Sequence, residues 1–572
     1  MLKRLGFDYK KHFKNHLDLR FKVSKTSGYM GMKIRLLAGA MICAPLLLPF
    51  EMPAAMAETP NTTSRPAASS SASSGASPGA SPGASSGASS GASSGASPGA
   101  SSGASSGASS SASSSASSSA TSGAPAAESS GGTTGSVYIK IGDAALKRSQ
   151  MAIPAFQYSG SAANAHAIRV GKELFDVFSK DMEISDYFEI QKQGAFLEDT
   201  SKVGLKPAAP GETGGFSYTS WKQIGTEFLV RVGYRVTGDE LVADTYTYYV
   251  TEQRLILGKT YKASVRDVRT VAHTFANDLV HALTGEKGMF LSKLVTSRST
   301  VPGQKEIFVM DWDGANVKQI SNHKTIAQSP TWSPDGKSIA YSAFAFHANE
   351  KSRNLDMFTY NLTTGRRSLV SYRSGINSGA SYMPDGKNLL LTLSNGGNPD
   401  IYKMTIDGRT LTKLTNGRSG DLNVEPAPSA DGAKIAFSSN RNERPHIFVM
   451  NSDGSSPKQI TFAGVYNSTP AFSPDGKRIA FAGYESSHFD IFVMDADGTN
   501  MIRLTSDAKS SGKMSNNEDP TFAPDGKHIL FRSDRTGHYQ LYVVNMGGKN
   551  EEHRITFDSR DYYKPRWSPS FE

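Results

Sequence analysis

The sequence predicts an all-β, six-bladed β-propeller over residues 288–572, preceded by a small α/β domain and a disordered Ser/Ala/Gly-rich N-terminal tail. Two observations predict the propeller. The first is a recurring phrase, clearest as Ser473-Pro474-Asp475-Gly476-Lys477, whose counterparts lie near positions 335, 385, 431 and 525. The second is a further Gly-containing tight turn after each copy. Repeats of this length, with short β-rich segments between such turns, are typical of propeller blades.

The turn chemistry agrees with this architecture. Proline fixes φ at one corner of the first turn, and Asp-Gly tolerates the positive φ that a tight hairpin needs. The apolar run at 491–494 has large side chains on both faces, as stacked blades require. An ordinary β-sandwich is the alternative, but nothing in that fold demands a repeat of this period.

The repeats predict six blades and a closed ring. The second turn appears as Asp313-Gly314, Thr364-Gly365, Asp407-Gly408, Asp453-Gly454, Asp497-Gly498 and Gly547-Gly548. A truncated copy of the first phrase, Trp567-Ser568-Pro569, ends the repeats. We therefore expect the C-terminal strand to be the innermost strand of the blade that begins near Leu291, which removes an exposed sheet edge.

Residues 1–57 resemble a leader with a secretory signal peptide. Lys33 and Arg35 precede an apolar run at 36–50, and an Ala-x-Ala site predicts cleavage between Ala57 and Glu58. The run is short for a membrane span, which needs roughly 20 residues. We therefore expect export to the periplasm.

The leader also explains most of the charge. It holds ten of the basic residues and three acidic ones, so a formal net charge of +10 falls to near neutrality in the remainder. No strong attraction to nucleic acid is expected. The single cysteine, Cys43, lies in the leader, so the mature chain has no thiol, disulfide or Cys-based metal site.

Residues 58–135 are almost entirely Ser, Ala, Gly and Pro, and we expect them to be disordered because they cannot bury enough apolar surface. They contain Gly-x-Ser-x-Gly matches such as 75–79. A nucleophile elbow needs a strand before it and a helix after it, and neither is predicted here.

Residues 136–287 are predicted to form the α/β domain. Strands are expected at 137–141, 151–156, 187–191, 228–236 and 241–250. Helices are expected at 163–180 and 266–283, with Gly285 as the stop of the second. Their apolar faces are Ile168, Gly171, Leu174, Phe175 and Phe178 on the first, and Val268, Val271, Phe275, Leu279 and Leu283 on the second.

No catalytic motif is evident. There is no H-E-x-x-H and no Walker-type loop, and His273 and His281 are interpreted as structural histidines. We expect no catalytic residues and no cofactor, although Glu425, Glu518 and Asp519 could attract a cation into the channel. A propeller-type periplasmic hydrolase acting on peptide or glycan remains the alternative function.

Six equivalent triplets precede the innermost strands and are predicted to form a polar ring at one mouth of the channel, suited to docking a partner. The candidate partner-binding residues are Gln328, Ser329, Asn377, Ser378, Asn423, Glu425, Asn467, Thr469, Asn517, Glu518, Asp519, Tyr563 and Lys564.

The chain resembles the TolB family of the Tol–Pal envelope system. The resemblance covers about 137–569 and rests on the Ser-Pro-Asp-Gly-Lys and Val-Met-Asp-x-Asp-Gly phrases, on 221–225 (WKQIG), and on 272–274 (AHT) through 283–290 (LTGEKGMF). It implies a monomeric, non-enzymatic periplasmic adaptor that does not bind nucleic acid.

The resemblance further implies that the lipoprotein Pal binds the channel mouth and that TolA binds an N-terminal strand, in support of outer-membrane integrity and cell division. The predicted TolA segment is Val137, Tyr138, Ile139, Lys140, Ile141, Gly142 and Asp143, which could add a strand to a partner sheet. In the family this segment begins the mature chain, whereas here the tail at 58–135 precedes it.

Overall fold

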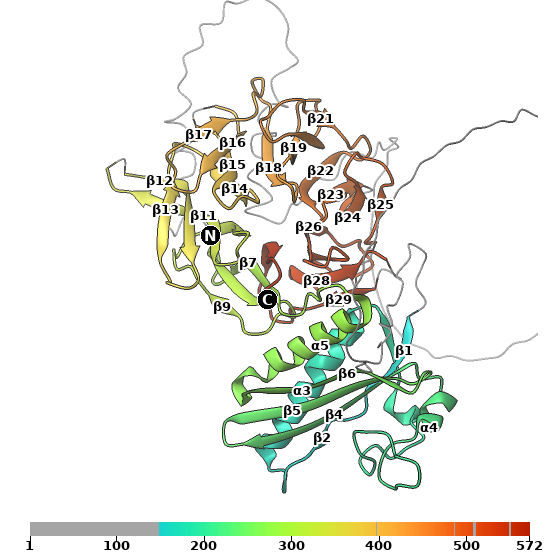
Figure 1. Ribbon diagram of the computed structural model, residues 1–572. Coiled ribbons are helices and arrows are strands. Elements are labelled where there is room, and N and C mark those ends of the chain that lie inside the picture. The colour runs from blue at the N-terminus through green and yellow to red at the C-terminus, as the bar shows by residue number, and fades with distance from the viewer. Residues whose placement is uncertain are drawn as a thin grey trace, which may run out of the picture. The chain divides into compact units, whose positions relative to one another are not determined.

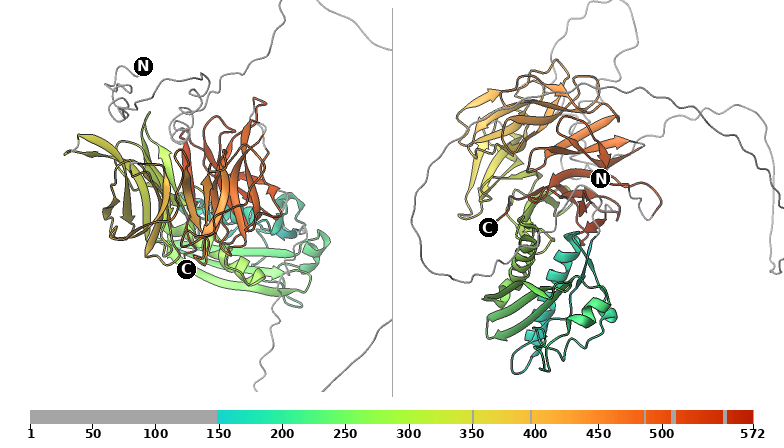
Figure 2. Two further views of the ribbon diagram at one scale, coloured as in Figure 1. Left: turned by 90° about the horizontal axis from the view of Figure 1, so that it is seen from above. Right: turned by 45° about the vertical axis from the view of Figure 1, so that its right-hand side comes forward.

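The computed structural model describes residues 148–349, 351–395, 397–485, 487–506, 511–547 and 551–571. The predicted leader, cleavage site, tail, first strand at 137–141 and TolA segment at 137–143 lie outside these residues. The described chain forms an α/β domain followed by a propeller of six blades (Figures 1 and 2), which confirms the predicted fold class.

The α/β domain is built on one mixed sheet of order β3-β1-β4-β5-β6, with β2 also paired to β4. Its strands are β1 (Ser149–Ala152), β2 (Gln157–Tyr158), β3 (Phe188–Ile190), β4 (Phe228–Thr237), β5 (Glu240–Tyr249) and β6 (Arg254–Ser264). Its helices are α3 (Ala165–Ile184), α4 (Tyr218–Gln223) and α5 (Val268–Thr284), with 3₁₀ turns at Gln193–Ala195 and Val265–Asp267.

Two strand predictions need correction. The strand expected at 151–156 is two short strands, because Pro154 between them has no N–H to donate to a ladder. Both pieces pair in parallel with β4. Strand β6 was not predicted, since it is a largely exposed edge strand in which only Tyr261 is buried and no alternation marks a core face.

The two long helices follow the prediction closely. Asn164 caps α3 by accepting a hydrogen bond from the Ala167 amide, and Gly285 ends α5 with a left-handed φ of 73°. The rings of Phe178 and Phe275 stack at 4.3 Å and join the two helices. The predicted face of α3 was wrong at Ile168, whose side chain is 55% exposed.

Each blade is a four-stranded antiparallel sheet, named here by its first strand. The blades are β10 (Ala327–Trp332), β11 (Ser338–His347), β12 (Ser352–Asn361), β13 (Arg367–Ser371); β14 (Asn377–Tyr382), β15 (Asn388–Leu393), β16 (Asp400–Thr405), β17 (Leu411–Lys413); β18 (Asn423–Pro428), β19 (Lys434–Ser439), β20 (His446–Asn451), β21 (Lys458–Gln459); β22 (Tyr466–Phe472), β23 (Arg478–Glu485), β24 (His488–Asp495), β25 (Ile502–Arg503); β26 (Asn517–Phe522), β27 (His528–Ser533), β28 (Gln540–Asn545), β29 (Glu552–Arg554); and β30 (Tyr562–Trp567), β7 (Lys293–Ser299), β8 (Lys305–Asp311), β9 (Lys318–Gln319).

The ring closes as predicted. The C-terminal strand β30 pairs with β7, with Trp567 opposite Leu294 and the Ser568 amide 2.8 Å from the Lys293 carbonyl oxygen. The first and last strands of the propeller sequence, β7 and β30, therefore share one sheet, and no blade edge is left open at the closure.

The antiparallel blades give the propeller two different faces. We number the four strands of each blade 1 to 4 in the order given above. The face on which strand 1 begins and strand 2 is connected to strand 3 is called the mouth face. The Pro-Asp-Gly and Asp-Gly turns lie on the opposite face, called the turn face. The α/β domain contacts the turn face: Lys527 Nζ lies 2.9 Å from the Tyr187 hydroxyl, and His528 Nε2 lies 2.9 Å from the Ile184 carbonyl oxygen. The mouth face is on the other side of the wheel from these contacts.

Candidate partner-binding site at the channel mouth

The predicted triplets do not precede the innermost strands but form the first half of each. In all six blades the pairing register between strands 1 and 2 shifts at the triplet, which marks a β-bulge. The third residue of each triplet has a positive φ, between 48° and 61°; these residues are Ser329, Gly379, Glu425, Thr469, Asp519 and Lys564. A bulge of this kind redirects a side chain relative to the regular pleat.

The repeated backbone conformation is costly. A left-handed conformation costs a non-glycine residue about 1–2 kcal/mol, and five of the six positions carry a side chain. Strain that recurs at this position in five blades must be offset by interactions formed there, and such strain is typical of functional sites.

Lys564 supplies such interactions in the centre of the channel. Its Nζ lies 2.6 Å from Glu425 Oε1 and 2.9 Å from Asp519 Oδ1. Glu425 is on β18 and Lys564 on β30, and two blades separate these strands in either direction around the ring. The Lys564–Glu425 ion pair therefore spans the channel between opposite blades.

A second buried cation, Arg532 of β27, completes the cluster. It pairs with Glu518 at 2.8 Å and with Asp519 at 2.7 Å. Its guanidinium carbon lies 4.2 Å from the centre of the Tyr539 ring and 5.1 Å from that of Tyr563, a cation–π arrangement on both rings.

Burial and charge act in opposite directions on these groups. Burial alone would raise the pKa of Asp519, but the charges of Lys564 and Arg532 outweigh it and hold this pKa below its ordinary value. For Glu518, burial prevails over the attraction to Arg532 and raises the pKa. On Lys564, burial is outweighed by the Asp519 and Glu425 charges, so its pKa is raised.

These contacts change the interpretation of the three acidic residues. The sequence indicated that Glu425, Glu518 and Asp519 could attract a cation into the channel, and the structure places the chain's own Lys564 and Arg532 among their carboxylates. Among the described residues, no group of His, Cys, Asp and Glu side chains is arranged to hold a metal ion.

The asparagines of the predicted rim are buried, and each is hydrogen-bonded to the preceding blade or to the loop that leads from it. Their Nδ2 groups donate to the Leu355 carbonyl, to Asp400, to the Ala463 carbonyl and to Asp490, for Asn377, Asn423, Asn467 and Asn517 respectively. Gln328, Thr469 and Asp519 are also buried. The predicted rim residues that remain partly exposed are Ser329, Ser378, Glu425, Glu518, Tyr563 and Lys564.

Sequence reasoning missed Arg532 and Tyr539, because both lie outside the triplets. One signal for Arg532 was present: this charged residue directly follows the apolar run Ile529-Leu530-Phe531 within the same strand, β27. A charged residue in a buried strand almost always has a partner of opposite charge, so this position predicts an ion pair. No comparable signal marked Tyr539.

The predicted structural histidines lie away from the mouth face. His273 of α5 is buried, and its Nδ1 lies 2.8 Å from Asp181 Oδ2 on α3. Burial, only partly opposed by His273, raises the pKa of Asp181 to about 6. His281 is exposed and faces the Glu286 carbonyl at 3.3 Å.

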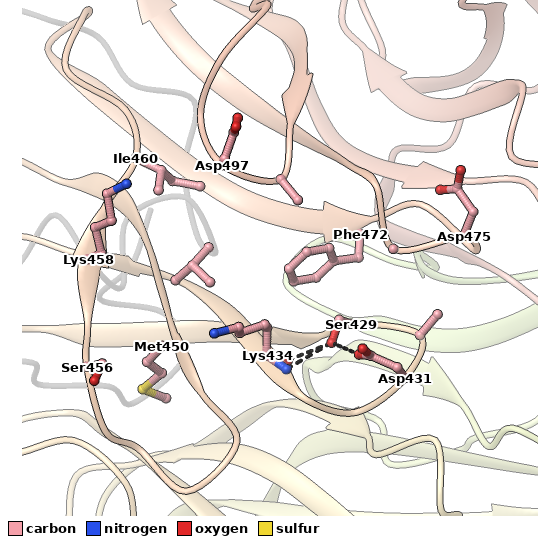
Figure 3. Close-up of a pocket in the computed structure, with 14 residues that line it drawn as sticks. Ser429, Asp431, Lys434, Met450, Ser456, Lys458, Ile460, Phe472, Asp475 and Asp497 are labelled. Atoms are coloured by element: carbon pink, nitrogen blue, oxygen red, sulfur yellow. Dashed lines mark hydrogen bonds between the residues drawn. The ribbon is translucent and has the colours of Figure 1, made fainter. Parts of the chain in front are cut away.

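A cavity on the turn face lies between the β18 and β22 blades (Figure 3). Its volume is about 750 Å³, and Lys434, Lys458 and Phe472 are among its lining residues. Ala430, which also lines it, stands where the other phrases have proline. This cavity is on the opposite side of the wheel from the triplets and takes no part in the channel cluster.

Comparisons with known proteins agree with both parts of the fold. A family model described as the TolB beta propeller domain matches residues 280–470 and 465–572, and one described as the TolB amino-terminal domain matches residues 137–255. TolB from Acinetobacter baumannii, a solved structure, superposes with a TM-score of 0.61 at 23% identity, covering 75% of this chain and 98% of that one. This likeness concerns the fold.

Curated relatives carry the same family name. The Tol-Pal system protein TolB of Desulfosudis oleivorans is 31% identical over 279 residues, which is 49% of this chain and 60% of that protein. That of Geobacter metallireducens is 37% identical over 173 residues, 30% of this chain and 38% of that protein. The matched regions thus span less than two thirds of these relatives.

Proposed function

Because the chain belongs to the TolB family, we propose that it is a non-enzymatic component of a Tol–Pal system, which binds Pal on the mouth face of the propeller and TolA through residues 137–143. The curated relatives are named as Tol-Pal system proteins. In this role the protein acts in the periplasm and supports outer-membrane integrity and cell division.

The observation that carries the proposal is the bulged triplet at the mouth of every blade. Six equivalent backbone segments converge there on a rigid scaffold, with Ser378, Tyr563 and Lys564 partly exposed. The α/β domain contacts the other face of the wheel, so the mouth face is accessible to a folded partner without displacing that domain.

The charge pairing supports binding rather than acid–base catalysis. Asp519 and Glu518 are each paired with Arg532, and Glu425 with Lys564. A carboxylate held in a buried ion pair is poorly placed to exchange protons with a substrate. The hydrolase alternative predicts turnover of peptide or glycan by the purified protein, and none is expected.

The TolA segment is proposed from the family resemblance. Residues 137–143 lie shortly before β1, which begins at Ser149 and pairs with both β3 and β4. Addition of an extended segment to a partner sheet would use backbone hydrogen bonds. Deleting 137–143 should abolish TolA binding and leave Pal binding intact; equal TolA binding after the deletion would remove this segment from the contact.

Export is the remaining part of the proposal. Within the described ranges, no helix combines the length and apolar character needed to cross a bilayer. Cleavage between Ala57 and Glu58 predicts a mature protein that begins at Glu58, and N-terminal sequencing of the protein recovered from a periplasmic extract tests it.

The Pal site is tested by a pair of arginine substitutions on opposite faces. Ser378→Arg places a bulky side chain at the mouth, where its size obstructs the docking of a partner, and Ser456→Arg places the same side chain on the exposed turn face. We expect Ser378→Arg to weaken capture of purified Pal at least tenfold and Ser456→Arg to leave it unchanged. Undiminished capture by the Ser378 variant would place Pal elsewhere.

A further inference from the structure

Three aromatic side chains stand out on the mouth face by their exposure. Phe462, Phe557 and Tyr372 are 77%, 73% and 65% exposed, the highest values among the large hydrophobic residues that the structure describes. Each lies in the loop that leads from the fourth strand of one blade to the first strand of the next.

The three aromatics occupy one equivalent position in alternate blades. Each directly follows a buried hydroxyl residue at the end of strand 4: Ser371, Thr461 and Thr556. The same position in the three intervening blades is Asn322, Asn416 and Ser506, all exposed. Going round the wheel, aromatic and polar residues therefore alternate, and the aromatics lie at three corners of the face.

The local structure explains why this position points to solvent. In five blades the preceding hydroxyl accepts a hydrogen bond from a backbone amide in the first half of strand 3, as in Thr461 Oγ1 with the Ile447 amide at 2.9 Å and Thr556 Oγ1 with the Leu541 amide at 2.8 Å. With the hydroxyl fixed inward, the next side chain is directed outward.

Folding does not require aromatics at these positions. The intervening blades satisfy the same hydroxyl contact with asparagine or serine at the next residue. An exposed Phe or Tyr gains almost nothing by burial within the chain. Large exposed apolar side chains held on a rigid scaffold mark an interaction site.

The charges around the aromatics indicate the chemistry of the occupant. Exposed cations on the mouth-face loops include Lys324, Lys351, Arg418, Arg444, Lys513 and Arg560. In the described part of these loops the exposed acidic residues are Glu443 and Asp558, and Asp558 is paired with Arg298. Arg554 also lies over the Phe557 ring at 4.9 Å. The face is therefore complementary to an acidic surface.

We propose that Tyr372, Phe462 and Phe557 form a three-point anchor that seats an acidic, folded protein domain on the mouth face. The inference rests on the proposed function, because it assigns the anchoring contacts of that same partner. A protein fits better than a bilayer, since the partly exposed Ser378 and Glu518 at the centre of the face would lose water against lipid without gaining hydrogen bonds.

The test compares two triple variants at the same structural position. Tyr372→Ser with Phe462→Ser and Phe557→Ser removes the anchor; Asn322→Ala with Asn416→Ala and Ser506→Ala is the matched control. Binding of purified lipid-free Pal is measured by titration calorimetry at low and high salt, with thermal melting as the check of folding. Both variants should melt like the wild type, because these side chains are exposed.

We expect the anchor variant to bind Pal at least tenfold more weakly, the control to bind like the wild type, and added salt to weaken the wild-type complex. If the anchor variant binds Pal as tightly as the wild type does, the three-point anchor is overturned and the proposed function stands. No binding by the wild type overturns both. If the wild type and the control variant sediment with phosphatidylglycerol vesicles and the anchor variant does not, the aromatics bind a membrane instead of a protein.

Discussion

Lys564 and Glu425 join opposite blades across the central channel, with Nζ and Oε1 2.6 Å apart. Lys564 belongs to β30, the strand that also closes the ring by pairing with β7. Strand β30 is thus fixed by two sets of contacts. Backbone hydrogen bonds join it to β7, and the Lys564–Glu425 ion pair joins it to the blade on the opposite side of the channel. The same ammonium neutralises Asp519, which is almost wholly buried.

Replacing Lys564 with methionine should destabilise the fold strongly. The substitution leaves Glu425 without its cation and leaves Asp519 with Arg532 alone, and removal of one partner from a buried pair costs about 3–5 kcal/mol. Urea unfolding measures the change. Lys434→Met, at an exposed lysine on the turn face, should change the unfolding free energy by less than about 0.5 kcal/mol. Equal effects of the two substitutions would show that the channel pair adds little.

The contact between the α/β domain and the propeller should weaken as pH rises. His528 is buried and presents Nδ1 to Asp525 Oδ2 at 2.6 Å and Nε2 to the Ile184 carbonyl at 2.9 Å, so both nitrogens face acceptors. Burial alone would lower the pKa of His528, but the Asp525 charge and hydrogen bond prevail and raise it above its ordinary value of 6.5.

A histidine with a raised folded-state pKa contributes stability that is fully present below the unfolded pKa and is lost as pH rises through the folded pKa. We therefore expect the melting temperature of the wild type to fall from about pH 6.5 upward more steeply than that of His528→Gln. Asp186 and His553 also act electrostatically on this group, and the difference between the two profiles removes their shared contribution. Parallel profiles would contradict the assignment.

Gly314 should tolerate a methyl group less well than Gly386, although both have positive φ, 84° and 64°. A Cβ on Gly314 would collide with the Ile555 carbonyl oxygen of the neighbouring blade, whereas a Cβ on Gly386 meets open space. Gly386→Ala should cost about 1–2 kcal/mol from the backbone alone. Gly314→Ala should cost roughly a further 1–3 kcal/mol from steric conflict. Similar midpoints in urea would mean that the blades move apart freely.

The propeller could be predicted because its information is local and repeated. Pro-Asp-Gly and Asp-Gly turns fix the hairpins, and the truncated phrase at Trp567 indicated the closing strand that now pairs with Leu294. The channel cluster could not be predicted in the same way, since Lys564 and Glu425 are 139 residues apart in sequence and meet only once the ring is closed.

The rim asparagines show a second limit of sequence reasoning. Asn423 and Asn517 look like solvent-exposed polar residues in the sequence, yet each is fully buried and donates to a buried aspartate, Asp400 or Asp490. An amide can satisfy its hydrogen bonds between two packed blades as well as in water, so polarity alone does not place it on the surface.

The central claim is that Pal seats on the mouth face, and amide hydrogen exchange of the mature protein with and without Pal tests it most directly. Protection is expected in 372–379, 462–469 and 557–564, the loops and bulged triplets of three alternate blades. The turns at 430–434, 474–478 and 495–499 on the opposite face should exchange unchanged. Protection confined to those turns, or to the outer strands of the blades, would contradict the account.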